Sequence, residues 1–247
     1  MKKIFLLIAS FFIASLTSMA QDATTRDYSD IWKRNKYFKF VYPIAQSKAT
    51  GSALEKGKYG VAIGYGHTFL FPKQPLWGLV KFGFDANWMD FQYVKYHNYD
   101  SAGGNLIEGG ENFLDKLGNL GRMSMQIGIL GIGPNATVAP FSMMDNQARF
   151  LKASIYFHYQ PTVGAYMMSQ DGDFESSFAY CNMFRFGGNI RWKMIGIGIE
   201  GFWGSGKFKP LDLNGFMDDE DDFIIADKPS KVKRKFASTR LYISLNF

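Results

Sequence analysis

Residues 236–247 read FASTRLYISLNF, and along this stretch apolar or small side chains alternate with polar ones up to the last residue. One set of alternate residues consists of Ala237, Thr239, Leu241, Ile243, Leu245 and Phe247. The other set consists of Ser238, Arg240, Tyr242, Ser244 and Asn246. Because successive side chains of a β-strand point to opposite faces, this stretch predicts a strand with one apolar and one polar face.

The first residues of the chain have the composition of a secretory signal. Lys2 and Lys3 are followed by an apolar run over residues 4–13 and by the small residues of Ser18-Met19-Ala20. A charged start, a short apolar run and small residues at the cleavage site are typical of a signal peptide. We therefore predict a cleaved signal peptide over residues 1–20, with an uncleaved anchor helix as the alternative.

The composition favours strands over helices in the rest of the chain. The chain is 47% hydrophobic and 17% aromatic, yet its mean hydropathy is only −0.14. After the signal sequence, no run of about 18 uninterrupted apolar residues provides a spanning helix. Lipid admits only helices and closed barrels, because every backbone polar group must be paired. The sequence therefore predicts an all-β, membrane-spanning, up-and-down antiparallel β-barrel.

Eight segments have the alternation that a barrel strand requires. They are residues 36–45, 58–71, 76–93, 121–140, 149–168, 177–191, 194–208 and 236–247. The links between them alternate between short and long, as the periplasmic turns and external loops of outer-membrane barrels do. We expect a periplasmic segment over residues 21–35, a barrel over residues 36–247, both termini in the periplasm, and a bulge or irregularity at Pro134.

The predicted inward faces carry charged side chains. Those expected to form a charge network in the lumen are Lys81, Asp85, Arg122, His158, Arg185, Glu200 and Arg240, with Lys152 and Arg191 on the same faces. The interior of an eight-stranded barrel is just wide enough to be filled by side chains, and buried charges must be paired. A lumen closed by internal ion pairs is one interpretation, and a narrow selective channel or a substrate pocket is the other.

Catalytic and metal sites have weaker support. Ser154, His158 and Ser238 share the inward face, but no motif links them as a nucleophile and its base, so we expect no enzymatic activity and no cofactor. The acidic run at residues 218–222 could bind Ca²⁺, although it lacks an EF-hand pattern and fits a solvated loop. The bases at residues 228–235 could contact lipopolysaccharide phosphates or pair with that run. Without Lys2 and Lys3 the net charge falls from +6 to about +4, because 26 bases then face 22 acids, and this charge is too mild and too dispersed to indicate nucleic-acid binding.

Several of these segments resemble known proteins. The closing Leu245-Asn246-Phe247 is similar to the insertion signal of bacterial outer-membrane β-barrels, which implies that Phe247 is recognised by the barrel assembly machinery. Residues 60–71, 81–88 and 132–140 resemble a group of small, uncharacterised, eight-stranded barrels of Gram-negative bacteria. The resemblance implies a location in the outer membrane and brings no catalytic residues with it.

Together these observations predict an outer-membrane barrel with a side-chain-filled lumen and a structural or surface-interaction role through its external loops. The expected partners are outer-membrane lipid, lipopolysaccharide and the assembly machinery, with no nucleic acid. A narrow passive pore for small solutes and a lipid-modifying enzyme remain as alternatives. A soluble, lipocalin-like barrel would need the opposite facing, with the apolar side chains inside.

Overall fold

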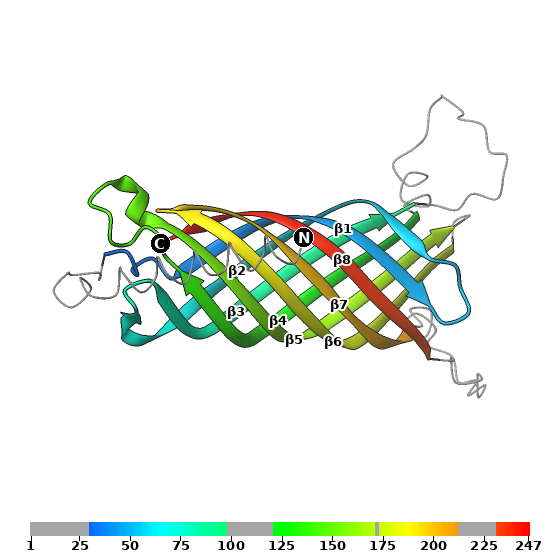
Figure 1. Cartoon of the computed structure of the whole chain (residues 1–247). Coiled ribbons are helices and arrows are strands. Elements are labelled where there is room, and N and C mark those ends of the chain that lie inside the picture. Colours follow the sequence, from blue (N-terminus) through cyan, green and yellow to red (C-terminus); the bar gives the residue numbers. More distant parts are fainter. Residues whose placement is uncertain (1–29, 98–120, 171–172, 212–230) are drawn as a thin grey trace, which may run out of the picture.

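The computed structural model describes residues 30–97, 121–170, 173–211 and 231–247, so the predicted signal peptide lies outside the described residues. Eight antiparallel strands form a closed barrel in which each strand pairs with its neighbours in chain order (Figure 1). The strands are β1 (Lys36–Ala49), β2 (Glu55–Leu76), β3 (Val80–Tyr96), β4 (Gly121–Val138), β5 (Leu151–Gln170), β6 (Asp173–Trp192), β7 (Ile195–Leu211) and β8 (Val232–Asn246). The predicted up-and-down β-barrel is therefore confirmed.

The last strand meets the first to close the barrel. The pairing of β1 with β8 is continuous from Tyr37 opposite Asn246 to Ala49 opposite Arg234. The end of the barrel where β1 begins and β8 finishes is called the terminal end below, and the opposite end the distal end. An even number of strands places both ends of the barrel chain at the terminal end (Figure 1).

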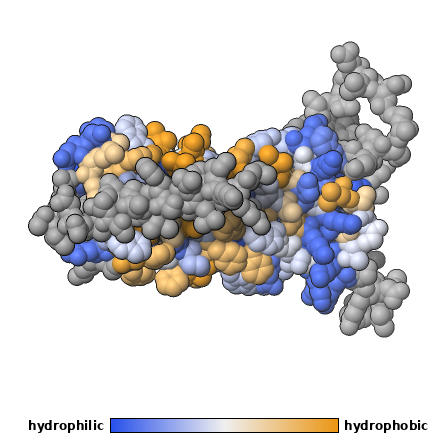
Figure 2. Space-filling view, in the orientation of Figure 1, coloured by the Kyte–Doolittle hydropathy of each residue, from blue (hydrophilic) through white to orange (hydrophobic). Residues whose placement is uncertain are grey.

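Apolar side chains point outward and charged ones inward. Phe82, Ile127 and Ile243 are 53%, 43% and 55% exposed, whereas Arg240 and Glu200 are almost completely buried. Figure 2 shows hydrophobic residues over the middle of the outer surface and hydrophilic residues towards the distal end. Exposed apolar side chains over a closed barrel fit a lipid environment and not water. The facing that a lipocalin-like barrel requires is therefore wrong for this chain.

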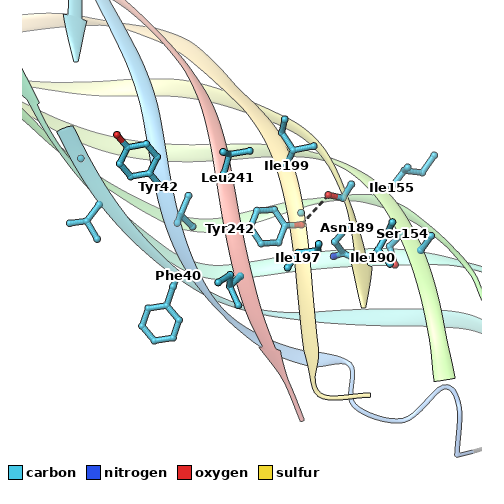
Figure 3. Close-up of a pocket in the computed structure, with 17 residues that line it drawn as sticks. Phe40, Tyr42, Ser154, Ile155, Asn189, Ile190, Ile197, Ile199, Leu241 and Tyr242 are labelled. Atoms are coloured by element: carbon cyan, nitrogen blue, oxygen red, sulfur yellow. Dashed lines mark hydrogen bonds between the residues drawn. The ribbon is translucent and has the colours of Figure 1, made fainter. Parts of the chain in front are cut away.

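The outer face of β5 to β8 and β1 is lined by isoleucine, leucine and aromatic side chains (Figure 3). Ile190, Ile197 and Ile199 are all more than half exposed there. They surround a hollow of about 900 Å³ beside Gly188, which has no side chain to fill it. This hollow is part of the apolar outer surface that faces the hydrocarbon region.

Three irregularities change which residues point inward, and one of them shifts the pairing of β2 with β3 between Gly57 and Tyr59. In β3, the pairing with β2 shifts between Met89 and Asn87, so residues after this bulge face the opposite way from those before it. In β4, the pairing with β5 shifts between Gly128 and Ile132, and Leu130 there has a φ of 54°. The irregularity that the sequence placed at Pro134 is therefore at Leu130, because a left-handed residue accommodates the extra position of the bulge.

Several strands extend beyond their predicted limits. β1 and β2 leave a link of only residues 50–54 between them, and β5 and β6 leave only residues 171–172. The link over residues 139–150 contains a short 3₁₀ helix, Gln147–Phe150, with Asn146 as its N-cap. Long and short links therefore alternate less regularly than the sequence indicated, because hairpins at the distal end continue past the predicted strand ends.

The pairing between β1 and β2 is interrupted in the middle of β1. The register is continuous from Lys36 to Val41 and resumes only at Gln46, shifted by one residue. Pro43 lies in the interrupted part and cannot donate a hydrogen bond to the ladder. Within the part of the chain that the structure describes, no helix is long and apolar enough to cross a membrane.

Candidate functional site

The middle of the lumen contains a compact network of two arginines and two acids. The Nη2 atoms of Arg185 and Arg240 lie 2.8 and 2.9 Å from the same Asp90 Oδ2. The Nε atoms of both arginines lie 3.5 and 3.2 Å from Glu200 Oε1. Both guanidinium groups also stack on the ring of Phe202, at 5.2 and 4.8 Å. All four charged side chains are buried inside the barrel.

Glu200 connects this layer to a lysine. Lys39 Nζ lies 3.3 Å from Glu200 Oε2, and Tyr156 donates a hydrogen bond to the same oxygen at 2.5 Å. The ammonium group also lies 4.5 Å from the ring centres of Tyr156 and Tyr242. A buried lysine that has both an acid and aromatic faces beside it is well compensated for its loss of hydration.

A third group surrounds Asp85. His158 Nε2 lies 2.9 Å from Asp85 Oδ2, and Tyr37 donates a hydrogen bond to the same oxygen at 2.6 Å. Thr68 donates to Asp85 Oδ1. The side chain of Asp85 therefore has partners from β1, β2 and β5, which connects strands on different sides of the lumen.

An apolar layer lies between these charges and the distal end. It is formed by the buried side chains of Ala45, Val94, Tyr96, Tyr166, Ala179, Cys181, Met183, Phe202, Phe208 and Phe236. Packing of aromatic rings, such as Phe208 against Phe236 with centres 5.6 Å apart, leaves little space for water. The lumen thus contains a hydrophobic layer as well as ion pairs, which the alternation pattern alone did not indicate.

The distal mouth is bridged by one acid and two arginines. Glu55 accepts hydrogen bonds from Arg122 at 3.3 Å and from Arg234 at 2.8 Å. Tyr166 also donates to Glu55 at 3.0 Å, and the guanidinium of Arg234 lies 3.5 Å from the centre of the Tyr166 ring. This cluster joins β2, β4, β5 and β8 across the mouth.

The terminal mouth is covered by the segment that precedes β1. Ile31 and Trp32 are buried beside Ala139, and three inward bases of the barrel contact this segment. Lys152 donates to the carbonyl oxygen of Ile31 at 2.6 Å, Arg191 donates to that of Arg34 at 3.5 Å, and Lys81 lies over the ring of Trp32 at 5.1 Å. We call residues 31–34 the cap, because they close the terminal end of the lumen.

The residues that the sequence singled out fall into different layers. Asp85 and His158 contact each other, Arg185, Glu200 and Arg240 share the middle layer, Lys81 lies under the cap, and Arg122 lies at the distal mouth with a side chain 29% exposed. The alternation therefore identified inward side chains from six strands without indicating which of them meet.

Four charged partners were missing from the sequence prediction. Lys39 is on the face opposite Phe38 and Phe40, so the alternation of this strand already indicated that its side chain points inward. Asp90 lies beyond the bulge of β3, where a strict alternation places it outside. Glu55 and Arg234 precede the predicted starts of their strands. The adjacent large side chains of Trp88 and Met89 are the one sequence signal of the phase change.

The geometry does not assemble a nucleophile with its base. Ser154 Oγ is bonded to Thr137 at 2.8 Å, whereas Ser238 Oγ and His158 Nδ1 have no hydrogen-bond partner in the described part of the chain. Among the described residues, no three His, Cys, Asp or Glu side chains form a group that could hold a metal ion. The acidic run at residues 218–222 lies outside the described residues.

Comparisons with known proteins give structural similarity only. No family model matches the chain, and no curated protein matches it. Among solved structures, Neisserial surface protein A has 8% identity and a TM-score of 0.41, with 86% of this chain and 97% of that chain covered. A major outer membrane protein from Thermus thermophilus has 11% identity and a TM-score of 0.36, with 85% and 99% covered. OprG from Pseudomonas aeruginosa has 10% identity and a TM-score of 0.34, with 87% and 97% covered.

The second and third of these structural neighbours are outer-membrane proteins by their names, the first is a surface protein by its name, and this chain is an eight-stranded barrel. The similarity is too low to transfer any activity, and the assignment of the fold rests on the strand pairing of this chain.

Proposed function

We propose that this protein is an outer-membrane β-barrel with a filled, non-conducting lumen, which serves a structural or surface-interaction role through its distal loops. The observation that carries the proposal is the layer of Arg185, Arg240, Asp90 and Glu200, whose side chains are buried and meet across the lumen. The apolar outer surface and the expected signal peptide support the location. The terminal end then faces the periplasm and the distal end faces outward.

Four groups of side chains lie one after another along the lumen, and this arrangement supports a barrel that does not conduct ions. An ion that entered from the distal mouth would meet the Glu55 cluster, the aromatic layer, the charge network and the cap in turn. An ion cannot cross an apolar layer without losing its hydration, which costs several kcal/mol. The inside of the barrel therefore acts as a core that stabilises the wall, and binding is left to the surfaces.

Conductance of the purified protein tests the proposal. The full chain is reconstituted into planar lipid bilayers, and a heat-modifiable band on an unheated gel confirms that the barrel is folded. We expect no sustained current, whereas a stable open conductance would overturn the filled lumen. Fractionation of cells is expected to place the folded protein in the outer membrane, and recovery in the soluble periplasm would overturn the location.

A narrow passive pore is the second candidate, and the observation that favours it is the cap. Residues 31–34 precede β1 and are separate from the barrel wall, so their displacement would expose Lys81, Lys152 and Arg191 at the terminal mouth. The same bilayer measurement on a chain that begins at Lys36 discriminates between the two. A filled barrel stays closed, and a capped pore opens with a preference for anions.

A further inference from the structure

The outer surface of the distal end carries lysines that lie directly opposite each other. Lys48 of β1 pairs with Lys235 of β8, and Lys207 of β7 pairs with Lys233 of β8. All four are exposed on the outward face of the barrel. Like charges directly opposite each other on one face of a sheet are destabilising. Two such pairs on neighbouring strands therefore indicate a surface that is completed by an anion.

No described acidic side chain neutralises these lysines. None of the four forms an ion pair with a residue that the structure describes. Glu175 is the single exposed acid at the distal end among the described side chains, and Glu55 is turned inward to Arg122 and Arg234. The positive charge on this part of the outer surface is therefore open to a partner from outside the described chain.

Each lysine pair lies beside a hollow with an apolar wall. One hollow, of about 530 Å³, is lined by Lys48 and Lys235 together with Phe184, Trp203 and Ala237. Trp203 is 42% exposed there.

The other hollow, of about 700 Å³, is lined by Lys207 and Lys233 together with Val163, Phe178 and Tyr180. Both hollows thus combine cationic groups with an apolar wall that continues into the lipid-facing surface. Figure 2 shows the same change from hydrophobic to hydrophilic residues along the barrel.

We propose that the two lysine pairs bind the phosphate groups of a phosphorylated glycolipid of the surrounding leaflet, with its acyl chains along Trp203 and Phe178. The proposal rests on the proposed membrane location and specifies one partner of the outer surface. Lysine is a compact cation suited to phosphate, and basic residues at a membrane surface are attracted to anionic lipid headgroups. A soluble anion would not use the apolar walls, whereas an amphiphile uses both parts of each hollow.

Native mass spectrometry of the folded full chain, released from detergent, tests the site with bisphosphorylated lipid A as the probe. We expect the lipid to bind, and the K207Q/K233Q and K48Q/K235Q variants to bind it about tenfold more weakly or worse. The K36Q/K193Q variant removes two lysines from the terminal end and is expected to bind like the unmodified protein. Equal binding by all variants would overturn the site.

Three further measurements identify the molecule that binds the lysine pairs. Lipid A without phosphates is expected to bind about tenfold more weakly or worse, and equal binding would overturn the role of phosphate. Pyrophosphate has no acyl chains, and displacement of the lipid by pyrophosphate at equal concentration would indicate a soluble anion instead. If lipid binds only after residues 218–222 are changed to their amides, that acidic run occupies the lysines and the proposal fails. In each case the heat-modifiable, non-conducting barrel persists, so failure of this site is distinct from failure of the proposed function.

Discussion

Arg185 of β6 and Arg240 of β8 share one carboxylate oxygen of Asp90, which reaches them from β3 across the lumen. Two like charges on a single acceptor are stable here because Glu200 contacts both Nε atoms and Phe202 lies against both guanidinium planes. The pair thus depends on acids contributed by two other strands. The network is a cross-brace of the barrel and not a set of independent ion pairs.

The Asp90→Asn substitution tests this brace. It removes the charge that both arginines share and leaves two buried cations with Glu200 as their main acid. Breaking a buried ion pair by changing one partner costs about 3–5 kcal/mol, and we expect a loss of that size in the free energy of unfolding. The measurement is urea unfolding of the barrel in lipid vesicles.

Asp30→Asn is the matched control for Asp90, because Asp30 pairs with Lys33 on an exposed surface. Exposed pairs contribute about 0–1 kcal/mol, so its unfolding midpoint is expected to stay near that of the unmodified protein. An equal midpoint for both variants would contradict the brace.

The cap gives a second prediction. Lys152 donates to the carbonyl oxygens of Ile31 and Lys33, at 2.6 and 3.4 Å. A methionine at position 152 has similar length but no donor, so Lys152→Met is expected to loosen the cap. The readout is the rate at which a cysteine at Ile31 reacts with a water-soluble maleimide, in a Cys181→Ala background.

We expect slow labelling of that cysteine in the otherwise unmodified chain, because Ile31 is buried, and labelling several-fold faster with Lys152→Met. Lys193→Met serves as the control, since Lys193 lies over the rings of Trp192 and Phe150 and does not contact the cap. Unchanged labelling in the Lys152 variant would show that the cap is held by packing alone.

The glycines of β4 give a third prediction. A Cβ at Gly133 would collide with the backbone carbonyl of Phe157 on β5, whereas the atoms nearest to one at Gly131 belong to the side chain of Gln160, no closer than 3.1 Å. Gly133→Ala therefore has to separate two strands, and we expect it to destabilise the barrel by about 1–3 kcal/mol, the usual cost of overpacking.

Gly131→Ala is expected to have a smaller effect, because a side chain can move more easily than a strand. Unfolding midpoints of the two variants in the same lipid give the comparison. If Gly131→Ala is the more harmful of the two, the close approach of β4 and β5 at Gly133 is not a constraint.

The terminal residue gives a fourth prediction. Phe247 is tied to Lys36 by two backbone hydrogen bonds, at 3.0 and 3.1 Å, while its side chain is 54% exposed. Its ring thus adds little to the barrel and is available to a recognition partner. We expect Phe247→Ala to leave the unfolding midpoint in vesicles unchanged and to lower the fraction assembled in the outer membrane of cells.

Leu241→Ala is the control, because Leu241 is exposed on the same face six residues earlier and lies outside the closing Leu245-Asn246-Phe247. It is expected to assemble like the unmodified chain. Equal assembly of both variants would remove the expected role of the terminal ring as a signal for the assembly machinery.

The sequence predicted the strands well where alternation is uninterrupted. In β8 the alternation from Phe236 to Asn246 matches the observed facing at every residue. In β3 the same reasoning fails after Trp88, because one extra residue reverses the facing of the rest of the strand. The position of a bulge depends on the neighbouring strands, so Asp90 and its two arginines could not be brought together from the pattern alone.

The layers of the lumen could not be predicted for a related reason. Which inward residues meet depends on how far each strand is displaced against the next around the barrel, a property of the closed ring. Tyr166 and Glu55 are 111 positions apart in the chain and yet share hydrogen bonds at the distal mouth. Their contact follows from closure, which no single strand encodes.

The interrupted ladder beside Pro43 has a consequence for the motion of the barrel. Local opening is least costly where backbone hydrogen bonds are missing. Amides of Tyr42, Ile44, Ala45 and their neighbours on β2 that point into this gap are therefore where hydrogen exchange should start, ahead of the continuous join between β1 and β8. The barrel is therefore expected to open first between β1 and β2, whereas the pairing that joins its first and last strands stays intact.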